Sequence, residues 1–180
     1  MNVTYKRGQW TTRDMTACAL MAVLLCVCTW IAIPGPVPFT LQTLAVFTAV
    51  ELLGARRAFW SVAVYLLMGA AGLPVFSGMA GGLGILLGPT GGYLLGFLLV
   101  PWICHVVTVV GKGKTVRIVG MVLGMIACYA LGTAWFVFVG GGADWRGALM
   151  LCVVPFLLPD AVKLVLAMTL AGTLRKRIRL

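Results

Sequence analysis

The sequence predicts an all-α integral membrane protein with six transmembrane helices and both termini in the cytoplasm, folded as a single membrane domain over residues 1–180. Composition is the first reason, because 62% of the residues are hydrophobic and 10% are charged, with a mean hydropathy of +1.07. A soluble domain carries about a quarter charged residues. The other two reasons are a series of six apolar runs and the placement of basic residues between them. We therefore expect a multi-pass protein of the cytoplasmic membrane.

Proline, glycine and basic residues separate the six apolar runs and set their expected boundaries. Pro34 follows the first run, and Arg56 and Arg57 follow the second. Pro155 and Pro159 interrupt the last run, where each would kink or open a helix. The expected spans cover residues 15–33, 40–54, 58–72, 91–110, 118–139 and 147–172.

Basic residues predict how these spans are oriented. Of the fourteen Lys and Arg residues, twelve fall on the side that holds both termini, Arg146 falls on the other side, and Lys163 lies inside a span. Cytoplasmic loops are enriched in Lys and Arg, so the loops 34–39, 72–90 and 140–146 are expected to face outward. The twelve are Lys6, Arg7, Arg13, Arg56, Arg57, Lys112, Lys114, Arg117, Arg175, Lys176, Arg177 and Arg179.

A Gly-rich stretch, residues 72–97, lies at the predicted outer face. Nine of its 26 residues are Gly and none is charged. Non-helical backbone at membrane depth must be buried in protein or line a cavity, and glycine lets the backbone approach a ligand closely. The second span, 40–54, is too short at about 1.5 Å per residue to cross a core of roughly 30 Å. We therefore expect an outward-facing cavity, with Gly78, Gly81 and Gly82 as ligand contacts.

Asp160 and Lys163 are the clearest candidate site residues. Ionisable side chains inside a membrane span are rare and usually mark a substrate or ion path. Their spacing of three residues places both on one face of a helix. By helical rise, Asp160 lies in the outer half of the bilayer, level with the expected cavity. The alternative is a self-satisfied ion pair that only packs against neighbouring helices.

Several blocks of the sequence resemble the BioY family. They are GLPVFSG and GPTGGYLLGF within residues 72–97, PVPFTLQTL at 36–44, YLLMG at 65–69, and the later Pro155-Phe156, Asp160 and Lys163. BioY proteins are the biotin-binding, membrane-embedded S components of energy-coupling factor (ECF) transporters. The resemblance implies high-affinity binding and uptake of biotin. It also implies partner subunits, namely a transmembrane coupling protein and two ATPases, which alone would use ATP.

The resemblance supports particular ligand contacts. The family pairs an Asp with a Lys three residues later, which matches Asp160 and Lys163, and it carries a polar pair that matches Gln42 and Thr43. Asp160 would accept a hydrogen bond from a ureido N–H of biotin. Lys163 would either donate to the ureido oxygen or pair with the carboxylate, and both poses stay open.

Four further residues are candidates for the expected site. Thr40 begins the second span, where it either contacts the ligand or caps the helix. Phe76 and Tyr93 are candidate apolar walls, and so is Trp30, for which a place in the interfacial aromatic belt is an equal alternative.

Other function classes lack their chemistry in this sequence. The formal net charge of +10 would suggest nucleic acid in a soluble protein, but here the basic residues lie between apolar runs. The segment 113–115 ends like a phosphate loop, although Thr108 stands where that motif needs glycine. His105 and six scattered cysteines form no metal site, and the spans carry no catalytic constellation. We expect no enzyme activity, no metal, no cofactor and no nucleic-acid partner, with lipid as the surrounding medium.

Three alternatives stay open at this point. The chain could be a BioY-type biotin transporter that works without an energising module. It could be a membrane subunit for another small, vitamin-like substrate. A structural membrane subunit without any ligand is the third, and the pair Asp160 and Lys163 argues against it.

Small residues at every fourth position predict close contacts between helices. In the fifth span they form an expected internal packing face, Gly120, Gly124, Cys128 and Gly132. The first span carries a similar ridge. S components dock their coupling protein through small residues on this span, so the ridge is expected either to dock a partner or to pack inside the chain. Its members are Cys18, Ala22 and Cys26.

Overall fold

The chain is mostly helical, and the computed structural model describes residues 10–35, 37–140 and 144–177. The helices and strands are α1 (Thr12–Trp30), β1 (Ala32–Ile33), β2 (Phe39–Thr40), α2 (Gln42–Leu53), α3 (Ala55–Ala70), the 3-10 turn η1 (Ser77–Met79), α4 (Leu83–Leu87), α5 (Gly91–Gly96), α6 (Leu99–Val110), α7 (Lys114–Val139), α8 (Trp145–Cys152) and α9 (Val154–Arg177).

Four helical stretches in the described part of the chain are long and apolar enough to cross a membrane. They are Thr12–Trp30, Gly91–Val110, Lys114–Val139 and Trp145–Arg175. Two shorter helices, α2 with 12 residues and α3 with 16, pack among them. The structure is therefore that of a multi-pass membrane protein, while the count of six spans stays a prediction.

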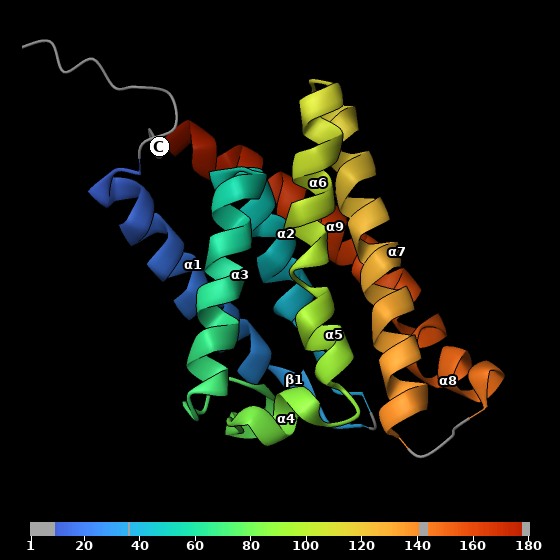
Figure 1. Ribbon diagram of the computed structural model, residues 1–180. Coiled ribbons are helices and arrows are strands. Elements are labelled where there is room, and N and C mark those ends of the chain that lie inside the picture. The colour runs from blue at the N-terminus through green and yellow to red at the C-terminus, as the bar shows by residue number, and fades with distance from the viewer. Residues whose placement is uncertain (1–9, 36, 141–143, 178–180) are drawn as a thin grey trace, which may run out of the picture.

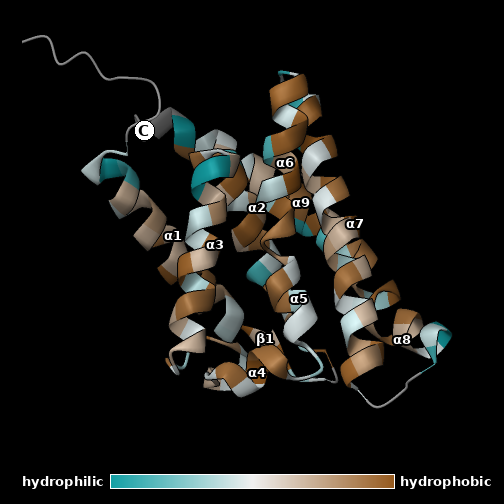
Figure 2. Cartoon of the chain, viewed as in Figure 1, coloured by the Kyte–Doolittle hydropathy of each residue, from teal (hydrophilic) through white to brown (hydrophobic). Residues whose placement is uncertain are grey.

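The two ends of the bundle differ in composition. The start of α1, the turn between α2 and α3, the turn between α6 and α7 and the end of α9 lie at one end, and the β1–β2 hairpin and α4 lie at the other (Figure 1). Hydrophilic residues gather at the first end, at the starts of α1 and α3 and near the end of α9 (Figure 2). Lys6, Arg7 and Arg179 of the predicted basic side lie outside the described residues. The end where α1 begins and α9 ends is also the basic end, because Arg56 and Arg57 lie at the α2–α3 turn and Lys112 and Lys114 at the α6–α7 turn.

A β hairpin replaces helix at the first expected boundary. The sequence suggested helix up to residue 33 and again from residue 40, but Ile33 pairs with Phe39 and Ala32 pairs with Thr40 in antiparallel strands. The cause is Pro34, because a residue that precedes proline favours extended backbone. At its other end α1 begins with a capping box, in which Thr11 and Asp14 exchange two backbone-to-side-chain hydrogen bonds of 3.1 Å.

Two long apolar runs are broken by proline. The run 91–110 forms α5 and α6, which are separated at Phe97 and Leu98. Pro101 explains this break, since its ring would clash with the carbonyl of residue 97 and it lacks an N–H group. In the last run Val153 separates α8 from α9, just before Pro155, and Pro159 is accommodated inside α9. The expected interruption of this run therefore occurs at its first proline.

The small-residue face of α7 is internal, as predicted. A Cβ atom on Gly124 would lie 2.6 Å from the Cα atom of Val100, and one on Gly120 would lie 2.8 Å from the Cα atom of Cys104. Both neighbours belong to α6, so the two helix backbones meet where neither glycine has a side chain.

The ridge on α1 is internal too. Cys18, Ala22 and Cys26 are at most 6% exposed. Of the two expectations for this ridge, packing inside the chain is confirmed. Docking of a partner through these side chains is wrong, because the chain itself already covers them.

We predict that Gly124→Ala lowers the melting temperature of the detergent-purified protein. The added methyl group meets backbone atoms of α6 that cannot rotate away, and such overpacking typically costs about 1–3 kcal/mol. Gly147→Ala on α8 is the matched control, because no atom lies within 4 Å of the position its Cβ would take. Equal melting temperatures for the two variants would contradict the close α6–α7 contact.

Candidate ligand cavity

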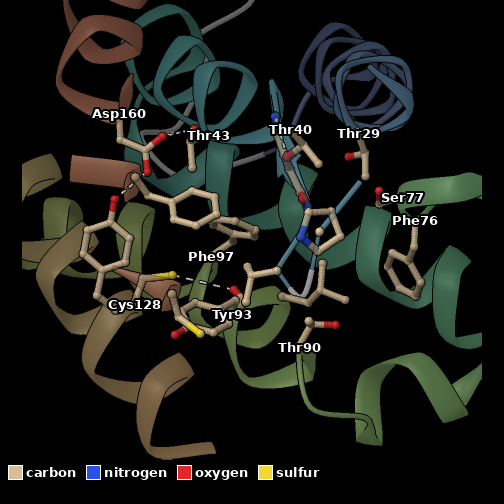
Figure 3. Close-up of a pocket in the computed structure, with 18 of the residues that line it drawn as sticks. Thr29, Thr40, Thr43, Phe76, Ser77, Thr90, Tyr93, Phe97, Cys128 and Asp160 are labelled. Carbon is tan, nitrogen blue, oxygen red and sulfur yellow. Dashed lines mark hydrogen bonds between the residues drawn. The ribbon is translucent and has the colours of Figure 1, made fainter. Parts of the chain in front are cut away.

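A cavity of about 310 Å³ lies between the hairpin and the helices, within the size range of small-molecule sites. Figure 3 shows Asp160 and Thr43 toward one side of the cavity and Phe76 and Ser77 at the opposite, right-hand side of the view. The lining residues come from most elements of the chain: Thr29, Gly35, Val37, Pro38, Thr40, Gln42, Thr43, Phe76, Ser77, Ile85, Thr90, Tyr93, Leu94, Phe97, Met125, Cys128, Tyr129, Cys152, Phe156, Asp160 and Lys163.

The carboxylate of Asp160 is the centre of the cavity's polar end. Its Oδ1 atom accepts hydrogen bonds from the Thr43 hydroxyl and from the Lys163 ammonium, both at 2.8 Å. Its Oδ2 atom accepts one from the Tyr129 hydroxyl at 2.5 Å. Asp160 itself is 5% exposed. Three donors from α2, α7 and α9 therefore converge on one buried carboxylate, which lowers the cost of burying its charge.

Lys163 joins this cluster to the hairpin. Besides its ion pair with Asp160, its Nζ atom donates to the main-chain oxygen of Thr40 at 2.8 Å. The ammonium also lies 4.2 Å from the centre of the Phe39 ring, a cation–π distance. The ring of Phe39 in turn packs at 5.8 Å against that of Phe156 on α9. These contacts fix β2 on α9, so one wall of the cavity depends on the buried ion pair.

Gln42 presents the cavity with an unused hydrogen-bond donor. Its side chain is 3% exposed and lines the cavity, and its Nε2 atom has no partner among the described residues. The hydroxyl of Thr40 accepts from the backbone N–H of Gln42 at 3.2 Å, but the N-cap residue of α2 is Leu41, and no side chain caps the helix. A buried amide donor without a partner is costly, and a ligand oxygen would satisfy it.

Aromatic side chains form the apolar walls. Phe76 is 1% exposed and meets the ring of Tyr65 edge to face at 5.6 Å. Its place depends on Gly69, where a Cβ atom would lie 2.0 Å from the tip of the Phe76 ring. Tyr93 is held through its hydroxyl, which lies 2.9 Å from that of Thr133. Both sequence-predicted walls therefore line the cavity, and each is held by contacts with a neighbouring helix.

The three loop glycines do not line the cavity. Gly78 and Gly82 have φ angles of +72° and +99°, which other residues rarely adopt, and a Cβ atom on Gly81 would lie 2.2 Å from the carbonyl oxygen of Leu73. Their observed role is to fold the loop that carries Phe76 and Ser77. As ligand contacts they stay predictions.

Trp30 lies outside the cavity as well. Trp30 is 42% exposed, and its Nε1 atom donates to the carbonyl oxygen of Pro74 at 2.9 Å. This placement is typical of an interfacial tryptophan, the alternative that the sequence left open.

Sequence reasoning missed several lining residues, among them Tyr129 and Thr29, whose hydroxyl groups form hydrogen bonds inside the bundle. Tyr129 bonds Asp160, and the Thr29 hydroxyl donates to the Leu25 carbonyl oxygen at 2.6 Å and lies 3.2 Å from the Tyr65 hydroxyl. The only sequence signal for these two residues was a hydroxyl group inside an apolar run. Such hydroxyl groups often bond only the backbone of their own helix, so they do not identify a ligand site. All six cysteines are free and buried, and the described residues hold no cluster of three or more His, Cys, Asp or Glu side chains suited to a metal ion.

Comparison with known proteins gives consistent matches along nearly the whole chain. The model of the BioY family matches residues 2–180. A biotin transporter BioY from Thermotoga maritima is 39% identical over 165 residues, covering 91% of this chain and 96% of that protein. A probable biotin transporter BioY from Pyrococcus horikoshii is 37% identical with the same coverage.

A solved structure agrees with these matches. The crystal structure of the S-component for biotin from an ECF-type ABC transporter has a TM-score of 0.80 and 26% identity to this chain. The match covers 93% of this chain and 95% of that one.

We predict that Tyr129→Phe destabilises the ligand-free protein more than Tyr93→Phe does. Each variant loses one phenolic hydroxyl, but Tyr129 donates to a carboxylate and Tyr93 meets a neutral hydroxyl. Hydrogen bonds to charged groups contribute about 1.5–3 kcal/mol and neutral ones about 0.5–1.5 kcal/mol. Thermal unfolding of both variants in the same detergent measures the difference. A smaller loss for Tyr129→Phe would show that Tyr129 does not support Asp160.

Proposed function

We propose that this chain, which belongs to the BioY family, binds biotin in the cavity beside Asp160 and carries it into the cell as the substrate-specific subunit of an ECF transporter. Its relatives are named as biotin transporters, and the chain is a transport protein rather than an enzyme. The observation that carries the proposed site is the buried carboxylate of Asp160 at the polar end of a cavity of about 310 Å³.

The chemistry of biotin matches what the cavity offers. Its ureido ring has two N–H donors and one oxygen acceptor, and its tail ends in a carboxylate. Asp160 already accepts three hydrogen bonds, and a carboxylate has about four lone-pair sites, so one ureido N–H can be added. The unpaired Nε2 atom of Gln42 can donate to the ureido oxygen. The aromatic walls formed by Phe76 and Tyr93 suit the apolar ring and chain.

Lys163, Thr43 and Thr40 complete the proposed site. Lys163 gives two of its three N–H groups to protein oxygens, which leaves one for the ureido oxygen or the carboxylate of biotin. Thr43 orients Asp160. The hydroxyl of Thr40 accepts one hydrogen bond from the backbone and keeps its own proton for the ligand.

The same proposal includes a location and partners. Six spans in the cytoplasmic membrane would place both termini and the basic end in the cytoplasm, because positively charged loops stay inside. The hairpin and the cavity would then face outward. The sequence contains no phosphate loop, so a transmembrane coupling protein and two ATPase subunits would supply the energy.

We predict that Asp160→Asn weakens biotin binding roughly 10- to 150-fold, the equivalent of about 1.5–3 kcal/mol for a hydrogen bond to a charged group. Calorimetry on detergent-purified protein measures the affinity. Asp144→Asn is the matched control, because Asp144 is exposed and outside the cavity. Unchanged affinity in folded Asp160→Asn protein would remove Asp160 from the site.

Gln42→Met separates binding from stability in the same experiment. It removes a donor that is unpaired among the described residues, so the melting temperature should be preserved while the affinity for biotin falls. A lower melting temperature with normal affinity would mean that Gln42 serves the fold alone.

We predict opposite accessibility for cysteines placed at Asp144 and Lys112. In intact cells a membrane-impermeant maleimide should label Asp144→Cys, and it should label Lys112→Cys only after the cells are opened. Both positions are exposed and the six native cysteines are buried, so background labelling should be low. Labelling of Lys112→Cys from outside would contradict the proposed orientation.

A further inference from the structure

A second cavity, of about 340 Å³, lies at the basic end of the bundle. It shares no lining residue with the ligand cavity. The lining comes from the start of α1, the turn between α2 and α3, and the end of α6, which lie at the same end of the molecule (Figure 1). The residues are Trp10, Asp14, Leu53, Gly54, Ala55, Arg56, Arg57, His105 and Thr108.

The charges that line this cavity leave a positive surplus. Arg57 pairs with Asp14 at 2.7 Å, so these two largely neutralise one another. Arg56 is exposed and forms no ion pair with a carboxylate in the described part of the chain. The cavity therefore presents an available guanidinium group, whose planar fork of donors suits a phosphate group.

An aromatic platform holds this guanidinium group. Its central carbon lies 5.6 Å from the centre of the Trp10 ring, and Trp10 meets Trp60 edge to face at 6.4 Å. Trp60 is 49% exposed. Partly exposed tryptophans are typical of the level where lipid headgroups meet the acyl chains, which places the cavity at headgroup depth.

An exposed apolar stripe runs along α3 from this platform. Trp60, Val64 and Leu67 follow Arg56 at helical spacing and are 49%, 38% and 68% exposed. On α6, beside His105, Val106 is 50% exposed. A charged cavity that continues into an apolar stripe matches a molecule with a charged head and acyl chains. A free phosphate ion would occupy the second cavity alone, without contact to the stripe.

We propose that this second cavity binds the phosphate headgroup of an anionic phospholipid, with Arg56 as its main contact and the acyl chains along Trp60, Val64 and Leu67. Basic pockets between helices on the cytoplasmic side of a membrane protein are suited to such headgroups. The site is separate from the proposed biotin site. The proposal rests on the proposed orientation, with the basic end in the cytoplasm, and not on the binding of biotin.

The test compares two lipids on the full-length chain in detergent, with native mass spectrometry as the readout. Phosphatidylglycerol should bind more tightly than phosphatidylcholine with the same acyl chains. Arg56→Gln should weaken phosphatidylglycerol binding about fivefold, as expected for the loss of one basic residue near the headgroup. Lys112→Gln, an exposed residue outside the cavity with the same change in charge, should leave the affinity unchanged.

Three results would overturn the proposal. They are equal affinity for the two lipids, an equal loss of affinity in Lys112→Gln protein, and displacement of phosphatidylglycerol by inorganic phosphate at equal concentration. Displacement by inorganic phosphate would assign the second cavity to a soluble anion. The melting temperature of each sample controls for folding.

If Arg56→Gln protein does not fold, the second measurement is the affinity of the unaltered chain for phosphatidylglycerol at different salt concentrations. Raised ionic strength should weaken phosphatidylglycerol binding, and binding that salt leaves unchanged would also overturn the proposal.

Discussion

The hydrogen bonds to the carboxylate of Asp160 are the interaction on which most of this structure depends. A charge buried at membrane depth is tolerated only with close partners, and here they come from α2, α7 and α9 through Thr43, Tyr129 and Lys163. These bonds therefore decide where three helices meet. Through the bond from Lys163 to the Thr40 carbonyl they also place the hairpin. The polar end of the cavity and the packing centre of the bundle share the same few oxygen atoms.

A second cluster joins the same three helices at the opposite end of α2. Glu51 is 4% exposed, and its carboxylate forms an ion pair with Arg117 of α7 at 3.3 Å. Arg175 of α9 donates a hydrogen bond to the main-chain oxygen of Glu51. Because α2 has only 12 residues, Thr43 at its start and Glu51 near its end are about two turns apart. This short helix is therefore fixed to α7 and α9 at both ends, which explains why it is nearly buried throughout.

The sequence predicted the helical membrane class, the internal face of α7 and the place of Asp160 and Lys163 beside a cavity, because each produces a strong local signal. A charge inside an apolar run seldom occurs without a binding or packing role, and glycines four residues apart on a long apolar helix mark a close helix contact. The hairpin and the break between α5 and α6 were missed, since hydropathy does not register the backbone effects of Pro34 and Pro101. The loop glycines at 78, 81 and 82 show a different limit. A glycine required for its φ angle and a glycine required for close approach to a ligand look alike in sequence.

The bond between Lys163 and the hairpin has a consequence for how this region can vary between related proteins. The ammonium group meets the main-chain oxygen of residue 40 and not a side chain, and every amino acid supplies that oxygen. Position 163 is therefore under chemical constraint. The attachment itself places no demand on the side chain at position 40, whose hydroxyl instead accepts from the N–H of Gln42 and is proposed to contact the ligand. Substitutions in the hairpin that spare Phe39 can therefore reshape one wall of the cavity and alter its selectivity, while the bond from Lys163 and the contacts of the Phe39 ring keep the wall in place.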